Sequence, residues 1–348
     1  MSAKKRYIIL VIMALLTTTV CGQQSQPFTQ YLFNRFLLNP AACGADGYTS
    51  VGLIVKDQWT GFAGAPFNQT LTAQVRVPRE GFFGKGGMFR SQDGFNPENI
   101  GLGFTMFNDV RGLIRTTGGS FTYAYHIETE TSQFSFGLAT SFSQLYIDRN
   151  KIVTELGYDR YIDANRLSTF IPEAAFGMHY TARDYYAGFS VSNLFQSYLT
   201  FGGRNSSGYK LERQYLVLGG YVFEINREWT LVPGIQFKIN ERAATQIDVS
   251  AIIYYYDQFW GGISYRSDEG GSSGWTSAIF GVRFGNYNFG YAFDYSIGNM
   301  QKFSYGSHEI MAIVTFGKVD RFNRLRRRYE FQDSELQYRN MWVGRRRR

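Results

Sequence analysis

The stretch Tyr287–Ser296, YNFGYAFDYS, decides the fold class of this chain. Its odd positions are all Tyr or Phe, whereas its even positions are Asn, Gly, Ala, Asp and Ser. Successive side chains of a β-strand point to opposite faces, so this segment has one face of aromatic rings and one face of small or polar groups. The pattern predicts a strand that separates an apolar environment from a polar one.

The same alternation returns across most of the sequence. In Gln133–Phe142 large apolar side chains alternate with Ser, Gly and Ala, and Tyr185–Asn193 repeats the pattern. We predict about fourteen such strands, centred near residues 54, 72, 104, 121, 139, 175, 190, 218, 234, 250, 262, 279, 291 and 312. Each segment is long enough for the ~9–11 residues of a tilted membrane strand. An even number of them is typical of an antiparallel, transmembrane β-barrel of the outer membrane.

Composition supports an all-β barrel and argues against two other classes. The chain of 348 residues contains 31 Phe, 25 Tyr and 5 Trp but only 7 Pro, and its mean hydropathy is −0.25. Beyond the N-terminus it has no run of the ~20 apolar residues that a membrane-spanning helix needs. A soluble β-sandwich also alternates, but it would need an implausibly large dry core to bury so many aromatic side chains.

The connections between the predicted strands alternate in length. Tight connections lie near residues 128–131, 182–184, 225–228, 256–258 and 285–287, and longer ones such as 147–168 and 197–212 lie between them. Short turns on one side and long loops on the other are the barrel arrangement, and we expect the tight set to face the periplasm. Pro78–Asn96 breaks this rule, since it is long and falls on the periplasmic side. It indicates either an insertion that reaches a partner or a slip in the strand count.

The chain divides into four predicted parts. Residues 1–22 have a basic start, an apolar run and a small-residue end, the layout of a signal peptide; a lipoprotein with an acylated Cys21 is the alternative. Residues 23–46 mix aromatic with polar groups, and we expect a plug inside the barrel or a lid beneath it. A barrel of about 14 strands is wider than the ~8-strand size that side chains alone fill. Residues 47–317 are the barrel, and residues 318–348 are a basic periplasmic tail.

The net charge of +8 is concentrated outside the predicted barrel. The tail 318–348 has eleven Lys or Arg and four Asp or Glu, and the leader adds three cations, so the remaining body is slightly acidic. The basic character therefore does not indicate a nucleic-acid partner. An even-stranded barrel begins and ends on one side, so we expect both termini in the periplasm of a Gram-negative bacterium and outer-membrane lipid around the strands.

The sequence contains no catalytic or metal-binding motif. His126, His179 and His308 are far apart and form no H-E-x-x-H pattern, and no G-x-S-x-G elbow or Gly-rich phosphate loop occurs. His308 next to Glu309 comes nearest to a hydrolase pair, and we interpret His308 as an interfacial residue at a strand start. Cys43, the one cysteine left once the leader is removed, is interpreted as a small residue of a turn. We expect no enzyme activity, no metal and no cofactor.

The residues that alternation assigns to the lumen are small and largely uncharged. The segments quoted above supply Gly137, Ala139, Ser141, Gly188 and Ser190 to this face. Such a lining argues against an ion-selective pore.

Two regions are candidates for partner binding. The loop between the first two predicted strands, Trp59–Gln69, has Gly and Pro for a turn and aromatic rings for the membrane interface, and Trp59, Phe62 and Pro66 are its candidate contact residues. The tail has two clusters of Arg around aromatic residues, and its candidates are Arg324, Arg326, Arg327, Arg328 and Trp342. We expect the tail to dock on an acidic periplasmic partner by charge, with anionic lipid headgroups or a free solvated tail as alternatives.

Three groups of residues form a specific signature. They are Gln30–Asn34 with Leu38–Ala41, Asp57–Phe62 with Gly64–Pro66, and Gly306–Met311 at the last predicted strand. Together they resemble the PorP/SprF family of the type IX secretion system, over residues 24 to 317. The insertion Pro78–Asn96 and the tail depart from the family pattern.

The resemblance implies a non-enzymatic outer-membrane barrel that this secretion route requires. It also implies partners among the periplasmic ring and lipoprotein subunits, and export of proteins with C-terminal sorting domains, including adhesins in gliding bacteria. The family supplies no catalytic residues. Alternation and composition alone leave a second class of function open, a porin-like channel or a carrier of apolar ligands, and the resemblance favours the first.

Overall fold

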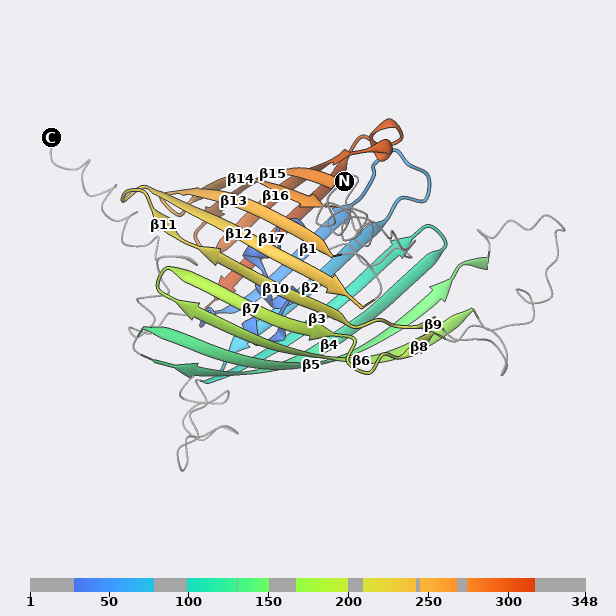
Figure 1. The fold of residues 1–348 in the computed structure, drawn as a ribbon, viewed down its shortest axis with the longest axis horizontal. Coiled ribbons are helices and arrows are strands. Elements are labelled where there is room, and N and C mark those ends of the chain that lie inside the picture. The colour runs from blue at the N-terminus through green and yellow to red at the C-terminus, as the bar shows by residue number, and fades with distance from the viewer. Residues whose placement is uncertain are drawn as a thin grey trace, which may run out of the picture.

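The structure is a computed structural model that describes residues 28–77, 99–129, 131–149, 167–199, 209–241, 245–267 and 274–316. Within these residues fourteen antiparallel strands close into a barrel, because β1 pairs with both β2 and β17 (Figure 1). The barrel strands are β1 (Thr49–Asp57), β2 (Phe67–Arg76), β3 (Ile100–Arg111), β4 (Ile114–Glu128), β5 (Ser132–Ile147), β6 (Ser168–Ala182), β7 (Tyr185–Ser192), β10 (Gln214–Tyr221), β12 (Trp229–Asn240), β13 (Gln246–Tyr255), β14 (Phe259–Ser267), β15 (Gly274–Phe284), β16 (Tyr287–Ile297) and β17 (Ser307–Phe316).

Three short strands add to this ring. β11 (Phe223–Glu224) follows β10 and continues its pairing with β12, whereas β8 (Tyr198–Leu199) and β9 (Tyr209–Lys210) form a separate two-stranded extension. All fourteen predicted centres fall within barrel strands, so the predicted fold class and strand number are confirmed.

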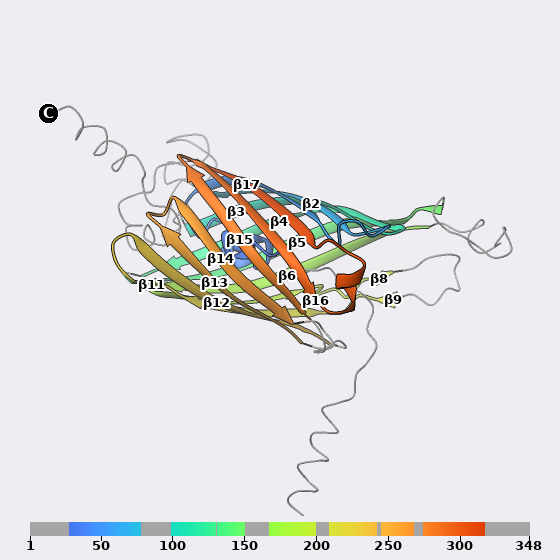
Figure 2. The same cartoon turned by 90° about the horizontal axis from the view of Figure 1, so that it is seen from above.

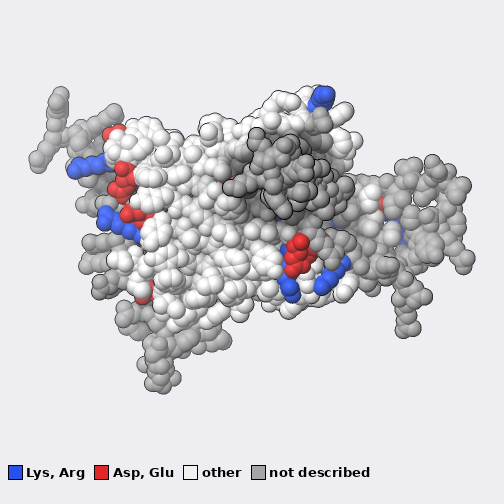
Figure 3. Space-filling model, in the orientation of Figure 1, with Lys and Arg blue, Asp and Glu red and all other residues white. Residues whose placement is uncertain are grey.

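The barrel is apolar on its outer surface and largely polar inside, the reverse of a soluble protein. Large apolar side chains point outward, and Phe121, Ile263 and Phe284 are 64%, 67% and 70% exposed. Many of the side chains that point inward are polar and buried, as the alternating burial of β16 illustrates. On the face drawn in Figure 3 the charged residues gather toward the two ends of the barrel. An apolar band between polar ends is what a membrane-spanning barrel presents to lipid.

The two rims of the barrel differ in the connections that they carry. One rim, here the tight-turn edge, carries the short connections 129–131, 183–184, 256–258 and 285–286. The other, the long-connection edge, carries 58–66, 148–167, 268–273 and 298–306. β17 ends at the tight-turn edge, on the left in Figure 1. The long-connection edge also has one two-residue turn, 112–113, which the sequence pattern did not single out. Pro78–Asn96 lies outside the described residues.

The chain before β1 folds as three short 3₁₀ turns, η1 (Tyr31–Phe33), η2 (Arg35–Leu37) and η3 (Pro40–Ala42). Pro40 starts η3, where its fixed φ suits the first position of a helix, and the Asn39 side chain caps the turn by accepting the Ala41 N–H. This segment lies within the barrel in Figure 2. No helix of the described residues is long and apolar enough to cross a membrane.

Candidate functional site

Five charged side chains meet inside the barrel and form what we call the lumen charge cluster: Lys56, Asp248, Arg266, Asp294 and Glu309. The Lys56 ammonium lies 2.8 Å from Asp294 and 3.3 Å from Glu309, and the Arg266 guanidinium lies 2.8 Å from Asp248. All five side chains are at most 5% exposed. Buried charges are costly unless they are paired and hydrogen-bonded, so this cluster needs all of its partners.

The N-terminal segment supplies several of those partners. The Glu309 carboxylate accepts the backbone N–H groups of Thr29 at 2.8 Å and Gln30 at 2.9 Å, and the Thr29 hydroxyl donates to Asp294 at 2.8 Å. Lys56 donates to the Thr29 hydroxyl oxygen at 3.1 Å. A carboxylate that accepts backbone N–H groups forms strong, charge-assisted hydrogen bonds. The cluster therefore holds the segment as well as the barrel wall.

Further along, the segment is fixed to other walls of the barrel. The Asn34 amide donates to the Thr72 hydroxyl at 3.0 Å, and the Asn39 amide donates to the Met178 carbonyl at 2.8 Å. The buried His126 ring donates from Nε2 to the Cys43 carbonyl at 3.0 Å. The polar residues of the predicted signature in this segment thus bind strands on several sides of the lumen.

Glycines in the wall leave room for the segment. A Cβ atom added to Gly137 would lie 2.3 Å from the Ala41 nitrogen, and one added to Gly177 would lie 2.0 Å from the Asn39 side chain. At Gly101 it would lie 2.1 Å from the Cys43 carbonyl oxygen. These distances are far shorter than a van der Waals contact, so the wall is shaped to fit the segment. Close backbone approach is a usual role of glycine within a strand.

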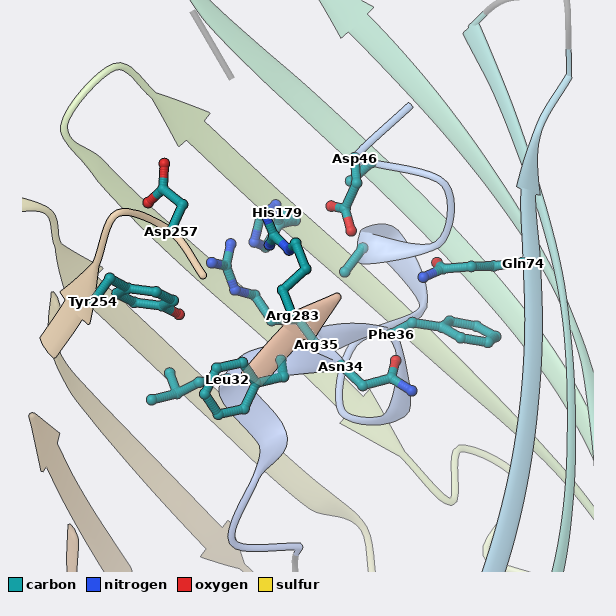
Figure 4. Close-up of a pocket in the computed structure, with 13 residues that line it drawn as sticks. Leu32, Asn34, Arg35, Phe36, Asp46, Gln74, His179, Tyr254, Asp257 and Arg283 are labelled. Atoms are coloured by element: carbon teal, nitrogen blue, oxygen red, sulfur yellow. The ribbon is translucent and has the colours of Figure 1, made fainter. Parts of the chain in front are cut away.

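A cavity remains between the segment and the wall, in the half of the barrel near the tight-turn edge (Figure 4). The segment contributes Arg35, whose guanidinium lies 3.9 Å above the Tyr186 ring, and the wall contributes Arg283. Asp46 and Asp257 lie on opposite sides of the cavity. Two cations and two acids therefore line this cavity, together with His179 and uncharged side chains.

The histidines do not form a catalytic arrangement with their neighbours. His308 contacts the outward-facing Tyr291 hydroxyl at 2.7 Å, whereas the adjacent Glu309 points into the lumen. These two side chains therefore lie on opposite faces of β17. His126 Nδ1 lies 2.7 Å from the Ser135 hydroxyl, but both residues are at most 1% exposed and enclosed by the segment. Among the described residues no group of His, Cys, Asp and Glu is arranged to hold a metal ion.

The loop that contains Trp59, Phe62 and Pro66 is pinned at the long-connection edge. The Trp59 N–H donates to the Ser307 hydroxyl at 3.1 Å, and backbone hydrogen bonds join Thr60 to both Tyr305 and Gly306. Phe62 is 43% exposed. The loop is therefore ordered, with an aromatic ring available on its surface. The other sequence-predicted site residues, Arg324, Arg326, Arg327, Arg328 and Trp342, lie outside the described residues.

The expectation of a largely uncharged lumen is wrong. Gly137, Gly188 and Ser190 do face inward, but the lumen charge cluster faces inward from β1, β13, β14, β16 and β17. The signal was present in the sequence, because charged residues stand at inward positions of these strands. The expectation rests on the most regular segments, around residues 133–142 and 185–193, whose inward positions carry no charged side chain.

A family model for the type IX secretion system membrane protein PorP/SprF matches residues 20–314. The chain belongs to the PorP/SprF family. The match covers the segment, the loop after β1 and the last strand, so it includes every group of residues in the predicted signature. No curated protein is similar enough in sequence to count as a relative.

Solved structures of outer-membrane barrels are similar to this PorP/SprF protein at low identity. The toluene transporter TbuX of Ralstonia pickettii has a TM-score of 0.44 and 10% identity over 80% of this chain and 92% of its own. A TodX monoaromatic hydrocarbon channel mutant has a TM-score of 0.42 and 10% identity over 81% and 93%. CdiB from Acinetobacter baumannii has a TM-score of 0.41 and 6% identity over 77% of this chain and 60% of its own. All three TM-scores are below 0.5.

Proposed function

We propose that this protein is a non-enzymatic outer-membrane component of the type IX secretion machinery that binds periplasmic ring and lipoprotein subunits. In this role it supports export of proteins with C-terminal sorting domains, and of adhesins in gliding bacteria. The observation that carries the proposal is the family match over residues 20–314. The closed barrel is consistent with it, because a barrel in the outer membrane is a fixed point on which a secretion machine can assemble.

The segment in the lumen bears on the alternative function, a porin-like channel or a carrier of apolar ligands. Residues 28–48 cross the lumen and bind strands on several sides, and glycines in the wall are shaped to them. We propose that residues 23–46 act as a plug, which is one of the two alternatives, plug or lid, that the sequence leaves open. On this proposal the exported proteins do not pass through the lumen, and the barrel anchors or adapts the machine.

Two surfaces are proposed to bind partners. The first is the pinned loop with Trp59, Phe62 and Pro66, since an ordered loop binds without first losing conformational entropy. It lies at the long-connection edge, so its partner would be on the side of the membrane away from the periplasm. The second is the tail, with Arg324, Arg326, Arg327, Arg328 and Trp342. β17 ends at the tight-turn edge, and in outer-membrane barrels the short turns face the periplasm. On this proposal the tail contacts periplasmic subunits, and its positive charge attracts an acidic partner.

Co-purification tests the proposed assembly. The full-length protein in mild detergent should retain periplasmic ring or lipoprotein subunits, and deletion of Val319–Arg348 should reduce their recovery in low salt. A variant with Lys302→Ser, an exposed cation in the connection between β16 and β17, serves as the charge control. Recovery unchanged by the deletion would remove the tail from the interaction. Absence of every such subunit from the full-length sample would contradict the assembly itself.

A further inference from the structure

The N-terminal segment has a direction within the barrel. At its first described residues it binds Lys56, Arg266 and Glu309, each of which lies one or two residues from a strand end at the long-connection edge. Before β1 it binds the opposite rim, where the Gly44 N–H donates to the Gln74 side chain at 2.9 Å and Arg76 donates to the Gly44 carbonyl. Residues 28–48 therefore run through the lumen from the long-connection edge to the tight-turn edge.

We infer that the chain enters the barrel through the mouth at the long-connection edge. The residues before Phe28 then lie on the same side of the membrane as the long connections, opposite to the end of β17. This differs from the expectation that both termini are periplasmic. An even strand number places Thr49 and Phe316 at one rim, but it does not constrain a segment that passes back through the lumen.

The packing of the segment opposes a return of the preceding chain to the tight-turn edge. Between Thr29 and the tight-turn edge, the lumen is occupied by the segment itself. Leu32 and Phe33 pack against a cluster of buried wall residues that includes Trp260, and the Phe33 and Trp260 rings lie 5.0 Å apart. Arg35 covers the Tyr186 ring still closer to that rim. A second strand of chain would have to displace these side chains or thread through the cavity beside Arg35.

Three parts of the chain then lie together at the long-connection edge: the start of the segment, the loop with Trp59, and the β16–β17 connection. The loop with Trp59 is bonded to Ser307, two residues before Glu309, which holds Thr29 and Gln30. Beside it lies the β16–β17 connection, in which Tyr305 is 82% exposed. The segment start and these loops form one composite surface, while β17 ends at the opposite rim. This inference does not depend on the proposed role in secretion.

Cysteine labelling of the full-length protein in cells tests the direction. Cys43 is replaced by Ala to remove the background thiol, and single cysteines are introduced as Ser25→Cys or, as a second variant, Gln24→Cys. Tyr305→Cys reports the long-connection side, and Arg227→Cys, in an exposed tight turn, reports the opposite side. A membrane-impermeant maleimide is applied to intact and to permeabilised cells, and heat-dependent gel mobility shows that each variant is folded.

We expect Ser25→Cys to be labelled under the same condition as Tyr305→Cys and at a similar level. Labelling that follows Arg227→Cys would overturn the inference. So would a failure of both Ser25→Cys and Gln24→Cys to react under either condition, since the residues before Phe28 would then be enclosed. Because the readout is labelling and not export, this result is separate from the outcome of any secretion assay.

Discussion

Lys56 and Glu309 are direct cross-strand neighbours where β1 meets β17, and their charged atoms lie 3.3 Å apart. The same Glu309 carboxylate accepts the backbone N–H groups of Thr29 and Gln30. One buried ion pair thus joins the first strand to the last and also holds the segment inside the lumen. Closure of the barrel and seating of the segment are therefore coupled in this structure.

Replacement of Lys56 by Met tests this coupling. Asp294 and Glu309 would lose their shared cation while they remain buried, and breaking a buried ion pair in this way costs about 3–5 kcal/mol. We expect a lower unfolding temperature in detergent and loss of the folded band on unheated gels at a lower temperature. Lys302→Met, at an exposed position, should leave both unchanged. Equal stability of the two variants would show that the cluster contributes little.

The fit between the wall glycines and the segment predicts the reactivity of Cys43. This thiol is fully buried beneath the segment and the wall, so a reagent in water does not reach it while the segment is seated. Gly101→Ala places a methyl group against the Cys43 carbonyl and should displace the segment at a cost of about 1–3 kcal/mol. We expect maleimide to modify Cys43 faster in this variant than in the parent protein.

Gly261→Ala is the matched control for that experiment. Gly261 also lies within a strand, but a Cβ atom there would meet its nearest neighbour at 3.7 Å, an ordinary contact. This variant should keep Cys43 as unreactive as the parent does. If Cys43 reacts readily in the parent protein, the segment does not stay seated and the proposed plug is wrong.

Conductance distinguishes a plugged barrel from an open channel. We expect the full-length protein in a planar bilayer to show little or no steady current, because residues 28–48 bind strands on several sides of the lumen. Deletion of residues 24–44 should produce stable openings, whereas deletion of Val319–Arg348 should not. A stable open channel in the full-length protein would favour the porin-like function.

A substitution in the pinned loop should reduce export without affecting folding of the barrel. Phe62→Ser removes an exposed ring while the backbone hydrogen bonds of Thr60 remain, so the barrel should fold normally. We expect reduced release of proteins with C-terminal sorting domains in cells that carry this variant. Phe195→Ser, which removes a 63% exposed ring elsewhere in the long connections, is the control. Equal release from both variants would remove Phe62 from the proposed contact.

The sequence predicts the barrel well because strand alternation is local. The period of two along Tyr287–Ser296 reports which side chains face lipid, and no tertiary information is needed to recognise it. The pairing within the lumen charge cluster cannot be read from the sequence, because its members lie on five strands far apart in the chain. Whether Lys56 meets Asp294 depends on closure of the barrel, and the pairing of Glu309 with Gln30 depends on where the segment enters. Neither is encoded in a local period.

The most direct test of the central claim is deletion of the gene, followed by comparison of the proteins released into the medium with those retained in the periplasm. The account predicts that proteins with C-terminal sorting domains, or a subset of them, accumulate in the periplasm. The full-length gene should restore their release, and the folded Phe62→Ser variant should restore it only in part. Normal release of every such protein in the deletion strain would contradict a role for this barrel in type IX secretion.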